Sequence, residues 1–181
     1  MPSNDISISV VENISQSVTV DASKIKIECN QKAASDKEGT DKLLDKSNNT
    51  KWVVNFKPKD TNLKLSFSEP IELASYTFVL ANDKPECDPI EWRVRIKESQ
   101  SLNIYEEFHK IEDYSAKKCA RGSTQEFKMR MRNPKKISEV TFHFDKLKDG
   151  NAKMMQICQI NINALGGVVS NVASKNTTTV T

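Results

Sequence analysis

The sequence alternates between apolar and polar residues with a period of two over most of its length. Such alternation places every second side chain on one face of an extended strand, so it predicts half-buried β-strands and not helices. The alternation is clearest in "SKIKIEC", "NLKLSFS", "EWRVRIK", "EFKMRMR" and "EVTFHFD". Because Pro, Asn, Asp and Gly separate these short segments, the sequence predicts an all-β fold, a single antiparallel β-sandwich.

We expect a jelly-roll-like sandwich of about eight strands in two sheets. The segment "MMQICQINI" is apolar on both faces, which predicts a strand covered on both sides. The one helical candidate is "TDKLLDKS", about two turns that begin at a Thr40 cap. The 181 residues fit one domain at 21–165, a flexible arm at 1–20 and a disordered tail at 166–181.

Charge and hydropathy exclude several classes of protein. The net charge is only +3, from 27 basic and 24 acidic residues, so nucleic-acid binding is not expected. No apolar run approaches the ~20 residues of a transmembrane segment. The N-terminus lacks the basic and apolar regions of a signal peptide, and the four cysteines lack the spacing of a zinc site. These features predict a cytoplasmic location.

Catalytic motifs are also missing from the sequence. It contains two histidines and five glycines, with neither a triad-like spacing nor a glycine-rich phosphate loop. Adjacent acids such as Glu106 and Glu107 are typical of solvated loops. The sequence therefore predicts a protein that is not an enzyme and that uses no catalytic cofactor.

Four stretches follow the order found in one branch of known β-sandwich domains. They are "DKLLDKSNNTKWVVNF" (Asp41–Phe56), "LKLSFSEPIELASYTFVLAND", "NDKPECDPIEWRVRI" and "MMQICQINI". The first contains Asp-x-x-x-x-Thr-x-Trp, and the third contains Asn-Asp-x-Pro-x-x-Asp-Pro-x-x-Trp. On these residues the chain resembles the discoidin, or coagulation-factor type-C, branch of the galactose-binding-like domains. The resemblance covers roughly residues 21–165.

The resemblance implies a structural calcium ion, for which Asp45, Asn48 and Thr50 match the loop ligands of the family. Two departures oppose the ion: Lys46 replaces the usual Gly, and Gln159 replaces the usual Glu of the closing strand. Calcium prefers about six to eight oxygen ligands including carboxylates, so both changes should weaken binding. The alternative is a turn tied by hydrogen bonds between Asp45 and Thr50.

The segment "ANDKPECDPIEW" interrupts the alternation with polar residues and two prolines. Asn82, Asp83 and Asp88 have short side chains that can accept hydrogen bonds from nearby backbone N–H groups. The prolines restrict the backbone in the unfolded chain. The segment is thus predicted to be a structural corner, and the alternative is that its tip, Lys84 and Glu86, also contacts a partner.

The strongest local bias of charge lies near "EFKMRMRNPKK". Lys128, Arg130 and Arg132 alternate on one face of the predicted strand, and Lys135 and Lys136 follow it. These five residues form either a solvated outer face or a surface for an acidic partner. Aromatic residues do not alternate with these cations on the same face, so base stacking is not expected.

Three functions are compatible with these features. The first is an intracellular interaction module that docks on another protein in a larger assembly, because some relatives serve in cilia or the cytoskeleton. The second is carbohydrate binding, typical of many relatives, which needs exposed aromatic rings beside hydrogen-bonding groups. The third is contact with anionic lipid through the basic strand. The candidate glycan-binding residues are Tyr105, Phe108 and Tyr114.

Overall fold

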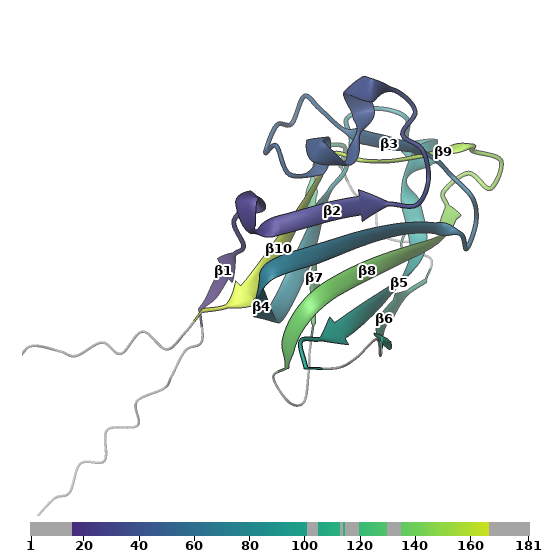
Figure 1. The fold of residues 1–181 in the computed structure, drawn as a ribbon. Helices are drawn as coiled ribbons and strands as arrows, with labels where there is room; N and C mark the ends of the chain where they lie inside the picture. The colour runs from purple at the N-terminus through teal and green to yellow at the C-terminus, as the bar shows by residue number, and fades with distance from the viewer. Residues whose placement is uncertain (1–15, 101–104, 113, 115–119, 130–134, 167–181) are drawn as a thin grey trace, which may run out of the picture.

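The computed structural model describes residues 16–100, 105–112, 114, 120–129 and 135–166, to which the following account is confined. This part contains ten strands, where the sequence predicted about eight (Figure 1). The strands are β1 (Ser17–Thr19), β2 (Ile25–Cys29), β3 (Trp52–Asn55), β4 (Thr61–Val79), β5 (Pro89–Glu98), β6 (Tyr105–Ile111), β7 (Thr124–Lys128), β8 (Lys136–Leu147), β9 (Met154–Ile157) and β10 (Gln159–Leu165). Four short 3-10 helices are η1 (Ala22–Lys24), η2 (Asp36–Glu38), η3 (Thr40–Leu43) and η4 (Pro85–Cys87).

The strands form an antiparallel β-sandwich whose two layers share the long strand β4. Residues 61–67 of β4 pair with β2 and β8, and β5 and β6 extend this layer beyond β8. Residues 73–79 pair with β10 and β7, and β1 extends this second layer beyond β10. The register of β4 against β8 shifts between Ser66 and Ile71, around the exposed Pro70. A proline cannot donate to the ladder, which is why the strand changes partners there.

The strand pair β3–β9 lies at one end of the sandwich, in the upper part of Figure 1. β1 and β10 lie side by side at the lower left, where Gly166 N–H donates to the Gln16 carbonyl at 2.8 Å. The described chain therefore begins and ends at one place, away from β3 and β9.

The segment "MMQICQINI" is covered on both faces, as the sequence predicted. Met155, Gln156 and Ile157 are all 1% exposed or less. The segment is, however, two strands and not one, because it is interrupted at Cys158. β9 pairs with β3, whereas β10 pairs with β4 and β1.

The predicted two-turn helix at "TDKLLDKS" is wrong in length and in its cap. Only Thr40–Leu43 is helical, as the 3-10 turn η3, and Gly39 occupies the cap position without a side-chain hydrogen bond. The turn instead holds Leu43, which is 0% exposed, against the core. Burial of one apolar side chain determines the local structure here more than helix propensity does.

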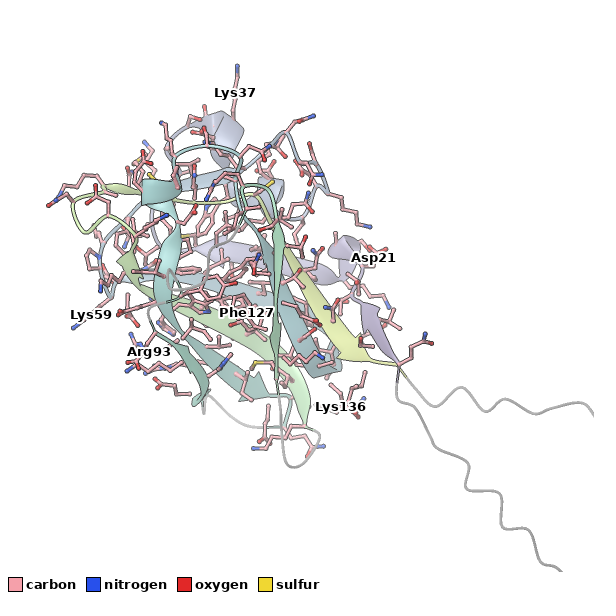
Figure 2. The ribbon with its side chains drawn as sticks, turned by 180° about the vertical axis from the view of Figure 1, so that it is seen from behind. Asp21, Lys37, Lys59, Arg93, Phe127 and Lys136 are labelled. Carbon is pink, nitrogen blue, oxygen red and sulfur yellow. The ribbon has the colours of Figure 1, made fainter. Side chains whose placement is uncertain are left out.

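An aromatic cluster fills the space between the two layers. Trp92 Nε1 donates to the Tyr76 hydroxyl at 2.9 Å, and the Tyr76 ring stacks on Phe127 with the ring centroids 5.0 Å apart. Phe78 and Phe142 complete the contacts, so strands β4, β5, β7 and β8 all contribute rings. Figure 2 shows Phe127 in the interior of the sandwich. Burial raises the pKa of the Tyr76 phenol, which keeps its hydroxyl protonated.

Replacement of Trp52 by Ala should destabilise the protein by about 3–5 kcal/mol, because the ring is buried and leaves a cavity. Trp52 is 0% exposed and lies 6.3 Å from the Phe144 ring, between centroids. Val18→Ala is the matched control, since Val18 is 58% exposed and should matter by less than about 0.5 kcal/mol. Urea unfolding measures both variants, and a change below about 1 kcal/mol for Trp52→Ala would place this loop elsewhere.

Candidate functional site

Three connecting segments meet where β3 ends and β9 begins, and we call them the loop end: residues 30–35, 55–60 and 150–153. Backbone hydrogen bonds join all three. Asn55 N–H donates to the Lys32 carbonyl at 3.0 Å, and Phe56 N–H donates to the Lys153 carbonyl at 2.9 Å. These bonds bring together residues that lie more than a hundred positions apart in the sequence.

Polar side chains fix the conformation of the loop end from within. The side-chain amides of Asn30 and Gln31 donate to the Asp60 carbonyl at 2.8 and 2.7 Å. The buried Thr61 hydroxyl accepts from Lys57 N–H at 2.9 Å and donates to the Lys57 carbonyl at 3.0 Å. The loop end is consequently held in one conformation before any ligand binds, which lowers the entropic cost of binding.

Several side chains of the loop end face solvent. The Asn55 side chain is exposed, and the Phe56 ring is half-buried against the core. Exposed lysines surround them from all three segments: Lys32, Lys57, Lys59 and Lys153. The sequence analysis missed this surface because its members are dispersed along the chain. Only the "KPKD" turn, residues 57–60, gave a local signal.

The "ANDKPECDPIEW" segment is a structural corner, as predicted, but the predicted hydrogen-bond donors are wrong. Asp83 accepts from Lys51 Nζ at 2.7 and 2.8 Å, and Asp88 is paired with Arg121. These donors are cationic side chains from distant segments and not neighbouring backbone N–H groups. Asn82 donates to the Asn48 carbonyl at 3.3 Å and does not act as an acceptor there.

Arg121 lies in the part of the sequence that is rich in basic residues, yet it serves the corner. Its guanidinium donates to Asp88 Oδ1 at 3.0 Å and to the Asp83 carbonyl at 3.2 Å. Burial raises the pKa of Asp88, and the guanidinium opposes that shift. The pair therefore keeps a mostly buried carboxylate charged inside the corner.

Replacement of Arg121 by Met should cost about 2–3 kcal/mol near pH 7, less than for a fully buried pair because the Arg121 side chain is 30% exposed. The Asp88 pKa in the folded state then rises further above its unfolded value. Stability of this variant should consequently increase as the pH falls through that raised pKa, so its deficit shrinks. Urea unfolding near pH 7 and near pH 4 measures this change, and a deficit independent of pH would contradict the assignment.

The residues implied for calcium lie together but are engaged with one another. Thr50 Oγ1 donates to Asp45 Oδ2 at 2.6 Å, as expected for a hydrogen-bonded turn. Gln159 Nε2 donates to Asn48 Oδ1 at 2.9 Å, and the Gln159 side chain is itself buried. Asp45 is the one carboxylate between positions 45 and 50. Calcium needs several free anionic oxygens, so these residues fit the ion poorly.

The double variant Lys46→Gly/Gln159→Glu tests this assignment. Lys46 has φ 59°, a left-handed conformation that favours glycine, and the Gln159→Glu change supplies a second carboxylate. We expect calcium to raise the melting temperature of the double variant and to leave the native protein unchanged relative to EDTA. Lys46→Gly alone is the control. A saturable calcium shift in the native protein would show that this loop already binds the ion.

The predicted basic strand is only partly described. Lys128 is exposed at the end of β7, whereas Lys135 pairs with Glu98 and Lys136 pairs with Glu72 at 3.2 Å. Arg130 and Arg132 lie outside the described residues. Two of the five predicted cations thus have acidic partners within the domain, and a role of this strand in partner binding stays a prediction.

Of the three aromatic residues predicted to bind glycans, Tyr114 has a structural role. Its ring packs against Trp92 and Phe127, and its hydroxyl donates to Gln125 Oε1. Tyr105 and Phe108 belong to β6, but their side chains lie outside the described part of the structure. Their role stays a prediction.

Two searches of the described residues bear on other kinds of site. No group of three or more His, Cys, Asp or Glu side chains that could hold a metal ion occurs among them. Within the same residues, no helix is both long and apolar enough to cross a bilayer.

Solved structures share this fold. An F5/8 type C domain from Bacteroides fragilis matches with a TM-score of 0.67 and 12% identity, over 82% of this chain and 97% of its own. A family 32 carbohydrate-binding module of Clostridium perfringens, solved with GalNAc-β-1,3-galactose, has a TM-score of 0.64 and 11% identity, over 80% and 99%. The family 32 module of NanJ from the same organism, solved with galactose, has a TM-score of 0.62 and 8% identity, over 82% and 99%.

Sequence comparison alone finds no relative: no protein-family model and no curated protein matches the chain. The structural matches establish the fold, which is the β-sandwich of discoidin-like, galactose-binding-like domains. The resemblance deduced from the four sequence stretches is therefore confirmed at the level of fold.

Proposed function

We propose that this chain is a non-catalytic carbohydrate-binding module that holds its ligand at the loop end. The match to two modules solved with galactose-containing sugars, over 80% and 82% of this chain, carries the proposal. Sugar recognition requires hydrogen-bonding side chains fixed beside an apolar surface. The loop end offers the exposed amide of Asn55 next to the half-buried ring of Phe56.

Preorganisation supports the choice of the loop end over other surfaces. Its three segments are joined by backbone hydrogen bonds at 2.9 and 3.0 Å, and Thr61 closes the turn at Lys57. The opposite corner has less to offer a ligand, because Asp83 and Asp88 are already engaged with Lys51 and Arg121.

The sequence analysis placed a protein-docking scaffold first, with a ciliary or cytoskeletal role. The solved neighbours give no support to these roles, and carbohydrate binding takes the first place. Docking on a protein partner is retained as the second candidate function. The cytoplasmic location stays a prediction from the sequence.

Binding to immobilised glycans that end in galactose or N-acetylgalactosamine tests the proposal. We expect Asn55→Ala and Phe56→Ala each to weaken binding by about tenfold, the effect of losing roughly 1.4 kcal/mol of contact energy. Thermal melting of both variants controls for damage to the fold, because Phe56 also packs against the core.

Tyr105→Ala and Phe108→Ala form the comparison arm of that experiment. If they abolish binding while Asn55→Ala does not, the glycan site lies on β6 and the loop end is the wrong location. If the native protein binds none of the glycans, the carbohydrate proposal itself is overturned.

A further inference from the structure

The loop end carries an excess of cations that lack acidic partners. Lys32, Lys57, Lys59 and Lys153 are exposed, and none of them forms an ion pair with any described residue. The backbone bonds from Asn55 to Lys32 and from Phe56 to Lys153 bring the carrier segments into contact. Figure 2 shows the Lys59 side chain pointing away from the body of the molecule. Four ammonium groups therefore converge on one small surface.

Elsewhere on the described surface most cations are neutralised by partners. Lys24 pairs with Glu69 at 3.4 Å, Lys64 with Glu28 at 3.1 Å, and Arg93 with Asp145 at 2.8 Å. Further pairs involve Lys26, Lys97, Lys110, Lys135, Lys136 and Lys146. The sheet faces are thus largely compensated, and the loop end is not.

The carboxylates beside the loop end do not offset its charge. Asp60 accepts from Gln31 Nε2 at 3.2 Å, and Asp149, which adjoins the third segment, accepts from Asn151 N–H at 2.9 Å. Neither carboxylate lies within ion-pair distance of a described lysine. The potential at this surface is therefore positive and open to an external anion.

The geometry points to an acidic polysaccharide as the ligand: we propose that these four lysines bind sulfate or carboxylate groups on a sugar chain held at the loop end. This inference rests on the proposed carbohydrate function and specifies its ligand class. Exposed lysines bind anionic groups as compact point charges, without the fixed fork geometry of arginine. Such contacts suit anionic groups repeated along a flexible polymer.

The distribution of apolar residues favours a polysaccharide over an anionic membrane. Insertion into a lipid interface requires exposed apolar side chains next to the cations. Among the described residues, the exposed large hydrophobics are Val18 and Leu165, beside the paired strands β1 and β10. Phe56 at the loop end is half-buried against the core. The lysines and the apolar side chains that a membrane would need lie at different places.

The test compares a soluble sulfated galactan with the same galactan lacking sulfate, by titration at about 0.15 M ionic strength. We expect the native protein to bind the sulfated polymer at least about tenfold more tightly, and higher salt to reduce this advantage. The variant Lys32→Gln/Lys57→Gln/Lys153→Gln should lose it. The control Lys24→Gln/Lys26→Gln/Lys136→Gln removes the same charge from paired lysines and should keep it.

Lys59→Gly separates loss of binding from loss of structure. Lys59 has φ 63°, a conformation in which glycine is unstrained, so the melting temperature should stay equal or rise. Binding to the sulfated galactan should fall nevertheless, by roughly two- to fivefold for one exposed charge. A fall in melting temperature with no change in binding would overturn the role of Lys59.

Other outcomes overturn the inference in distinguishable ways. Equal affinity for both galactans would overturn the acidic ligand and leave the carbohydrate function standing. Binding to neither polymer, nor to the neutral glycans tested above, would overturn both. Tighter binding to phosphatidylserine vesicles than to the sulfated galactan would assign the lysines to a membrane.

Discussion

The hydrogen bond from Trp92 to Tyr76, inside the aromatic cluster, is the interaction on which the rest of the structure depends. Its 2.9 Å length joins β5 of one layer to the part of β4 that belongs to the other. A buried indole N–H and a buried phenol would each be costly without a partner, so the pair satisfies both. The surrounding rings of Phe78, Phe127 and Phe142 exclude water from it. The two layers are consequently fixed relative to each other.

This constraint reaches the loop end through β4. The first residue of that strand, Thr61, is 0% exposed and bonds to both the N–H and the carbonyl of Lys57. Asn30 adds a second connection by accepting from Asn62 N–H at 2.8 Å. Because these partners belong to the core strand, the lysines of the loop end extend from a rigid base. The surface can therefore favour polymeric anions without ordering a loop at the time of binding.

The sequence predicted the sandwich because alternation with a period of two is a local property of each strand. The core positions Leu63, Trp92 and Phe142 could be read directly from it. The partners of Asp83 and Asp88 could not, since Lys51 and Arg121 lie 32 and 33 residues away. The loop end was missed for the same reason, because its lysines become neighbours only after β3 pairs with β9. Local patterns reveal strands, whereas sites made of distant loops require the strand pairing.

Native-state hydrogen exchange of the loop-end amides tests most directly whether the core holds this surface in place. The account predicts that Phe56, Lys57 and Asn62, whose amides donate at 2.9, 2.9 and 2.8 Å, exchange slowly. Their opening free energies should exceed about 3 kcal/mol and should fall when Trp92 is replaced by Phe. Exchange of these amides at the rate of an unstructured peptide would contradict the account, because the loop end would then not be preformed.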